Sequence, residues 1–121
     1  MKLALVAATV VLISVACGGG GGGGTSEGGG NRVTMTDFKF APSSLEVNSG
    51  SVTFSLVNSG GQLHDMVIQD KTGKVLARSP QIGAGDSTKF TVNNLPAGEY
   101  TFFCDVPGHK DLGMVGKLTA K

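Results

Sequence analysis

Near its C-terminus the chain reads Phe103-Cys104-Asp105-Val106-Pro107-Gly108-His109-Lys110-Asp111-Leu112-Gly113-Met114. A thiol, an imidazole and a thioether follow one another here with the spacing Cys-x4-His-x4-Met, at Cys104, His109 and Met114. Pro107 lacks a backbone N–H and restricts the backbone between the first two of these residues. Because a short loop limits the relative positions of its side chains, we expect the three donor groups to converge.

A further histidine, His64, lies well upstream in the segment Gly60-Gly61-Gln62-Leu63-His64-Asp65-Met66-Val67-Ile68. Two imidazoles, a thiolate and a weakly bound thioether form the ligand set of a mononuclear blue-copper electron-transfer site. Soft sulfur suits Cu(I), whereas imidazole suits both oxidation states. The residues therefore predict one copper ion, cycling between Cu(I) and Cu(II), with the ligands His64, Cys104, His109 and Met114.

Each of these side chains has a simpler explanation when it is taken alone. A single cysteine such as Cys104 is often a small buried hydrophobe. His64 alone is typical of a hydrogen-bonded structural histidine, and Met114 alone is typical of core packing. Zinc also accepts cysteine and histidine ligands, although a methionine gives little reason to build a zinc site. The combination of all four residues at these spacings favours copper.

The composition limits the possible function classes. Lys and Arg total 10 and Asp and Glu total 9, so the formal net charge is only +1. A nucleic-acid-binding domain needs a clustered basic face, and this balance gives no support for one, so we expect no nucleic-acid partner. The 121 residues allow at most one ordinary domain. With no Trp and a single Tyr, its core has to rest on Phe, Val, Leu and Ile.

The N-terminus has the pattern of an export signal. After Met1-Lys2, an uncharged and mostly aliphatic run covers residues 3–16, which is shorter than the roughly 20 residues needed to span a bilayer. We interpret residues 1–16 as a signal peptide. The run ends in Ser14-Val15-Ala16-Cys17, which resembles the lipobox of bacterial lipoproteins with Ser14 where leucine is usual. Lipidation of Cys17 would anchor the protein to a membrane. Ordinary cleavage after a small residue is the alternative.

The next segment, residues 17–30, is mostly glycine after Cys17. Such a composition has no apolar side chains to bury and behaves as a flexible tether with a reach on the order of 20 Å. We therefore expect an exported protein on the periplasmic or extracellular side, tethered to a membrane through Cys17. A disulfide between Cys17 and Cys104 is the alternative use of the two cysteines, but Cys17 lies outside the expected domain.

The folded domain is expected over residues 31–121. Short alternating or β-branched runs are separated there by turn residues, which is typical of an all-β sandwich or barrel. On this pattern we expect strands near residues 32–38, 44–47, 51–58, 65–69, 74–78, 87–92, 99–104 and 113–120. Roughly seven or eight strands in a domain of this length predict a two-sheet Greek-key β-sandwich.

Three segments resemble the cupredoxins, the superfamily of plastocyanin and azurin. They are Phe40-x-Pro42-x-x-Leu45-x-Val47-x-x-Gly50, His64-Asp65-x-x-Ile68 and Phe102-x-Cys104-x-Val106-Pro107-Gly108-His109-x-x-x-Gly113-Met114-x-Gly116. The resemblance covers essentially all of residues 32–121, and its most specific part is the segment around Cys104. It implies a β-sandwich that binds copper through His64, Cys104 and His109, with Met114 as a long axial ligand.

The resemblance also implies roles for residues around the ligands. Asp65 stands where many relatives have asparagine. Its backbone N–H is expected to reach the Cys104 sulfur, and its side chain is expected to brace the ligand loop. Pro107 is expected to shape that loop. In the family the C-terminal histidine, here His109, lies at the solvent edge within an apolar docking patch, and the candidates for that patch are Val106, Pro107 and Leu112.

We therefore expect a one-electron carrier that exchanges electrons with a redox donor and a redox acceptor protein, at the membrane surface or in the periplasm. A monomer is the default expectation. The alternative is a copper chaperone or storage protein of the same fold, which would favour solvent-exposed ligands. An enzymatic interpretation makes Cys104 and His109 a nucleophile and a base, but the sequence offers no group to orient them and no second metal site. We do not expect an enzyme.

Overall fold

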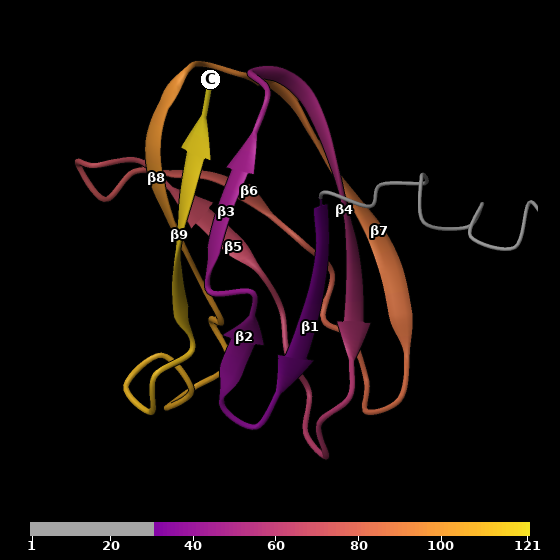
Figure 1. Ribbon diagram of the computed structural model, residues 1–121. Helices are drawn as coiled ribbons and strands as arrows, with labels where there is room; N and C mark the ends of the chain where they lie inside the picture. Colours follow the sequence, from indigo (N-terminus) through magenta and orange to yellow (C-terminus); the bar gives the residue numbers. More distant parts are fainter. Residues whose placement is uncertain (1–30) are drawn as a thin grey trace, which may run out of the picture.

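The structure, a computed structural model, describes residues 31–121 (Figure 1). This part of the chain contains nine β-strands and no α-helix. The strands are β1 (Arg32–Thr36), β2 (Lys39–Ala41), β3 (Ser44–Val47), β4 (Gly50–Asn58), β5 (Val67–Gln69), β6 (Val75–Arg78), β7 (Ser87–Leu95), β8 (Gly98–Phe103) and β9 (Val115–Ala120). No helix in these residues is long and apolar enough to cross a bilayer. The expected signal peptide (1–16) and the tether with Cys17 (17–30) lie outside the described residues and stay predictions.

The strands form two sheets, ordered β2-β1-β4-β7 and β3-β9-β8-β5-β6. Most neighbouring strands are antiparallel, but β1 runs parallel to β4 and β3 runs parallel to β9. The chain therefore changes sheets between β2 and β3, which ties the N-terminal part of the domain to both layers. This arrangement confirms the predicted all-β architecture with two sheets.

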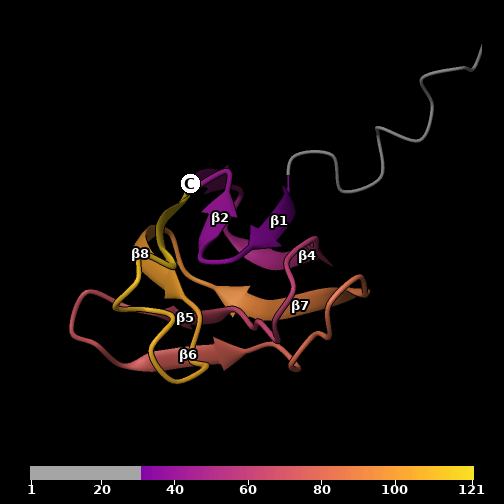
Figure 2. The same cartoon turned by 90° about the horizontal axis from the view of Figure 1, so that it is seen from below.

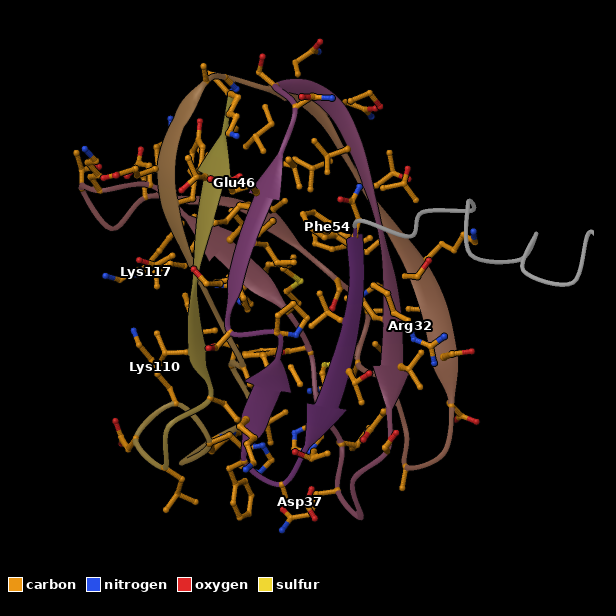
Figure 3. The ribbon with its side chains drawn as sticks, in the orientation of Figure 1. Arg32, Asp37, Glu46, Phe54, Lys110 and Lys117 are labelled. Carbon is orange, nitrogen blue, oxygen red and sulfur yellow. The ribbon has the colours of Figure 1, made fainter. Side chains whose placement is uncertain are left out.

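The core lies between the two sheets, where alternate side chains of each strand are buried. In β4 the buried apolar residues are Val52, Phe54 and Leu56. Phe54, labelled in Figure 3, stacks on Phe90 of β7 with 6.0 Å between the ring centroids. Across the sandwich, Phe102 of β8 meets Phe40 of β2 edge to face at 5.0 Å. This second pair joins one sheet to the other, and burial of such aromatic surface is a main source of stability.

The strand boundaries differ from the predicted ones at several places. β1 ends at Thr36, because the chain turns at Asp37 and Phe38 into β2. The strand β2 was not predicted, since three residues offer too few positions for an alternating pattern to show. β7 continues to Leu95, which pairs with Gly50 of β4, so this strand is longer than the one predicted near residues 87–92.

One end of the sandwich gathers segments that are far apart in the sequence. The β1–β2 turn, the β4–β5 loop and the β8–β9 loop all lie at the lower end of the molecule in Figure 1, and Figure 2 views the molecule from that end. Asp37 marks the β1–β2 turn at this end in Figure 3. The β4–β5 loop carries His64, and the β8–β9 loop carries the other three predicted ligands.

Candidate metal centre

The four predicted ligands come from two connections at this end of the sandwich. His64 is paired with Ile82 through two backbone hydrogen bonds, in which the His64 N–H donates to the Ile82 carbonyl (3.2 Å) and the Ile82 N–H donates to the His64 carbonyl (2.8 Å). Cys104 directly follows β8 and Met114 directly precedes β9. The pairing of these strands brings the two residues side by side, and the Cys104 N–H donates to the Met114 carbonyl at 3.1 Å.

The donor atoms of His64, Cys104 and His109 converge on one point. They all lie within 4.8 Å of one another. The Cys104 Sγ is 3.8 Å from the His64 Nδ1 and 3.5 Å from the His109 Nδ1. None of the three residues is more than 5% exposed, and Met114 is fully buried in the same cluster as Cys104. Metal–nitrogen and metal–sulfur bonds of about 2.0–2.3 Å allow donor atoms at these separations to surround a single ion.

Hydrogen bonds within the β8–β9 loop fix the spacing of its donor groups. The His109 N–H donates to the Val106 carbonyl at 3.0 Å, and the Leu112 N–H donates to the His109 carbonyl at 3.1 Å. The Met114 N–H also donates to the His109 carbonyl, at 3.2 Å. Backbone hydrogen bonds around His109 thus hold the loop in a compact conformation. The positions of its side-chain donor atoms are therefore fixed by the loop itself.

Each histidine directs its outer ring nitrogen to an oxygen acceptor. The His64 Nε2 is 2.7 Å from the Asp37 Oδ1, and the His109 Nε2 is 3.1 Å from the Gln62 Oε1. A hydrogen bond from Nε2–H to an oxygen fixes the tautomer in which Nδ1 carries the free lone pair. Both Nδ1 lone pairs therefore face the Cys104 sulfur, which is the arrangement that metal ligation requires.

The donor set fits copper. It combines two imidazole nitrogens and one cysteine sulfur with the methionine that lies beside them in the core. Sulfur ligands favour Cu(I), imidazoles accept both oxidation states, and the combination is that of a type 1 copper centre.

The comparison with protein families agrees with this assignment. A family model described as "Cupredoxin-like domain" matches residues 3–120. The chain belongs to the cupredoxin-like family. Among solved structures, reduced auracyanin from the photosynthetic bacterium Roseiflexus castenholzii superposes with a TM-score of 0.67 over 74% of this chain and 94% of that chain. At 19% sequence identity this likeness supports the fold alone.

The curated proteins that match this cupredoxin in sequence include a cuproprotein and an azurin. The copper-resistant cuproprotein CopI of Rubrivivax gelatinosus is 25% identical over 107 residues, which are 74% of this chain and 65% of that protein. The azurin of Pseudomonas fluorescens biotype A is 47% identical over 51 residues, which are 40% of this chain and 39% of azurin. The matched part of this cupredoxin therefore spans less than two thirds of the length of either relative.

Asp65 braces the ligand loop of this cupredoxin. Its Oδ1 accepts a hydrogen bond of 2.6 Å from the Asp105 N–H, next to Cys104, and the residue is buried. The Asp105 carboxylate in turn forms an ion pair with Arg78 at the end of β6. The Asp65 carboxylate acts here only as an acceptor, the one role that an ionised carboxylate has.

Replacing Asp65 by alanine is expected to lower the free energy of unfolding of the metal-free protein by about 1–3 kcal/mol, because the Asp105 N–H loses its acceptor. Asp65→Asn keeps an amide oxygen in the same place, so its free energy of unfolding is expected to fall clearly less than that of Asp65→Ala. Urea denaturation followed by circular dichroism measures both changes. Equal losses in the two variants would show that the charge of Asp65 matters more than its acceptor oxygen.

The surroundings of Cys104 make it a poor free nucleophile. Burial raises the pKa of the Cys104 thiol, and the backbone N–H groups of Asp65 and Val106 oppose that increase only in part. A raised pKa leaves little thiolate at neutral pH. This environment disfavours the interpretation of Cys104 and His109 as a nucleophile and base, whereas a bound metal ion replaces the thiol proton.

The predicted docking residues differ in exposure. Leu112 is 62% exposed and Pro107 is also exposed, but Val106 is half-buried and packs against the core. Leu63, which was not among the predicted residues, is 47% exposed and lies next to His64 in the β4–β5 loop. Phe38, also not predicted, lies edge-on to the His109 ring with 4.8 Å between centroids.

Sequence analysis also missed Asn58, which organises the β4–β5 loop. Its buried amide nitrogen donates to the carbonyls of Gln62 (2.7 Å) and Ile82 (2.8 Å), and its amide oxygen accepts from the Gly60 N–H (2.9 Å). The signal was present in the sequence: Asn58 continues the inward-facing series of β4, so a polar residue stands at a core position. A buried amide with such contacts holds the segment that leads into His64.

Proposed function

We propose that this cupredoxin holds one copper ion and carries single electrons between redox partner proteins. The observation that carries the proposal is the convergence of the buried His64, Cys104 and His109 donor atoms within 4.8 Å of one another. Copper, when bound, alternates between Cu(I) and Cu(II) and thereby supplies one-electron chemistry. The role of the protein residues is to keep the same ligands in place in both oxidation states.

The way in which the ligands are mounted supports electron transfer. His64 is fixed by its backbone pairing with Ile82, and Cys104 and Met114 are fixed by their mutual hydrogen bond at the start of the β8–β9 pairing. The outer nitrogen of each histidine is also engaged, by Asp37 and by Gln62. Ligands that are held from both sides move little when the charge of the metal changes, and a small rearrangement favours fast electron exchange.

We propose that partners dock at the surface around His109. Leu112, Pro107 and Leu63 expose apolar surface on the two loops that supply the ligands. Lys110 and Asp111 carry opposite charges in the same loop, so this face has no field of a single sign to steer a charged partner. An apolar partner surface fits these residues best.

A second candidate function is copper handling. The relative named copper-resistant cuproprotein CopI favours it, since that name refers to copper tolerance. The burial of the ligands favours the electron carrier, because a protein that hands over its metal needs ligands that a partner can reach. In this cupredoxin His64 and Cys104 have no exposed surface and His109 has only 5%.

The purified protein, loaded with Cu(II), is expected to show an intense visible absorption band from the cysteine–copper bond. The band should disappear on addition of one electron equivalent of a mild reductant and return fully on oxidation, over repeated cycles. Optical titration together with electron paramagnetic resonance measures both states. A colourless copper complex, or oxidation of Cys104 without a stable band, would contradict the proposed function.

The same copper-loaded protein distinguishes an electron carrier from a copper-handling protein. An electron carrier is expected to retain its copper through the reduced state when a competing Cu(I) chelator is present at equal concentration, so that the full band returns on reoxidation. Loss of most of the copper to the chelator within one cycle would favour copper handling instead.

A further inference from the structure

The carboxylate of Asp37 contacts the metal centre from the β1–β2 turn, which sequence analysis did not connect with the site. Its Oδ1 accepts from the His64 Nε2–H at 2.7 Å, and its Oδ2 accepts from the Gly61 N–H at 3.0 Å. The two oxygens thus hold both the ring of a ligand and the backbone of the loop that carries this ligand. The His64 ring is fully buried, whereas Asp37 is partly exposed.

The β4–β5 loop is shaped to admit this carboxylate. A Cβ atom at Gly60 would lie 2.4 Å from the Asp37 Oδ1 and 3.0 Å from the His64 Nε2. Any residue other than glycine at this position would therefore push the carboxylate and the ring apart. The absence of a side chain at Gly60 is a second, independent observation that the contact between Asp37 and His64 is built into the fold.

The two histidine ligands differ in the charge of their outer partners. The His109 Nε2 meets the neutral amide oxygen of Gln62, whereas the His64 Nε2 meets a carboxylate. Both oxygens of the Asp37 side chain accept hydrogen bonds, one from the Gly61 N–H and one from His64, which favours the carboxylate form of this group. A negative charge hydrogen-bonded to a ligand makes the imidazole a stronger donor.

We propose that Asp37 is a positioning residue that acts through His64 to stabilise Cu(II) relative to Cu(I) and so lowers the reduction potential of the site, an inference that rests on the proposed function. The physical reason is electrostatic. An anion one imidazole ring away from the metal interacts more strongly with a doubly charged ion than with a singly charged one. The buried ring between them excludes water, so solvent screens the interaction less than on an open surface.

The test compares Asp37→Asn with the wild-type protein in two measurements, the reduction potential and the separate affinities for Cu(II) and Cu(I). The asparagine oxygen can still accept from the His64 Nε2–H, while its NH2 group stands where Oδ2 accepted from the Gly61 N–H, so the variant removes the charge together with this one loop contact. We expect Cu(II) binding to weaken about tenfold more than Cu(I) binding. For a one-electron couple this difference corresponds to a potential about 59 mV higher.

Two further variants make the result specific. Asp111→Asn removes the same charge from an exposed position in the loop that carries His109, and it is expected to change the potential far less because solvent screens it. Gly60→Ala keeps the carboxylate but displaces it from His64, and it is expected to raise the potential as Asp37→Asn does. If Asp37→Asn does not take up copper, Gly60→Ala still tests the proposal.

The possible outcomes are distinct. A higher potential in Asp37→Asn and Gly60→Ala, with little change in Asp111→Asn, supports the proposal. Equal weakening of both oxidation states, which leaves the potential unchanged, or a lower potential overturns the proposal and leaves Asp37 with a structural role only, while the electron-carrier function stands. If the wild-type protein itself shows no reversible copper band, the proposed function fails and this inference fails with it.

Discussion

Replacing Cys104 by serine is expected to weaken copper binding at least about 100-fold and to abolish the intense visible band of the copper-loaded protein. Changes to groups that only contact metal ligands already cost about 10–100-fold in affinity, and Cys104 supplies a donor atom itself. A serine hydroxyl at this position is a hard and protonated donor, which suits Cu(I) poorly. Competition with a chelator of known affinity measures the first effect, and absorption spectroscopy measures the second.

The chain offers a matched control for this variant, because Cys17 is its other cysteine and has no predicted role at the metal. Cys17→Ser is expected to keep the wild-type affinity and spectrum. Circular dichroism of metal-free Cys104→Ser should match that of metal-free wild-type protein, since serine is close to cysteine in size. Wild-type copper affinity in a correctly folded Cys104→Ser variant would exclude the thiolate as a ligand.

The sequence predicted those parts of the site that depend on local spacing. Cys104, His109 and Met114 are recognisable because one loop between two paired strands carries all three, and the short loop requires them to lie close together. His64 was predicted as a ligand from its imidazole side chain and from the segment around it. The structure places its Nδ1 3.8 Å from the Cys104 sulfur. The alternation of buried and exposed residues likewise predicted the all-β sandwich.

The outer partners of the histidines were not predicted, because nothing in a single sequence connects them with the ligands. Asp37 is 27 residues away from His64 along the chain and was placed near the end of the strand expected over residues 32–38. Only the actual turn between β1 and β2 brings its carboxylate to the ring. Gln62 lies close to His64 in the sequence yet contacts the other histidine, His109, 47 residues away. Such contacts depend on how loops fold back, and hydrophobic periodicity does not encode that.

Gly116 illustrates a residue that sequence analysis found without giving a reason for it. It belongs to the segment that resembles the cupredoxins, and in the structure it is paired with Phe102 across β8 and β9. The Phe102 ring lies directly over it, in the space that a side chain would occupy. A Cβ atom at Gly116 would lie 2.1 Å from the Phe102 Cζ and less than 3 Å from two further ring atoms. The close packing of this pair thus explains the glycine physically.

Gly116→Ala is accordingly expected to lower the free energy of unfolding by at least about 3 kcal/mol, at the upper end of the range for overpacked cores. Phe102 is fully buried and packs edge-on against Phe40, so its ring has no free space to move into. A double-mutant cycle with Phe102→Leu tests this cause by chemical denaturation. Since leucine shortens the clashing side chain, the double variant is expected to be more stable than the sum of the two single losses predicts. Strictly additive losses would show that the alanine acts on the β8–β9 backbone and not through contact with the ring.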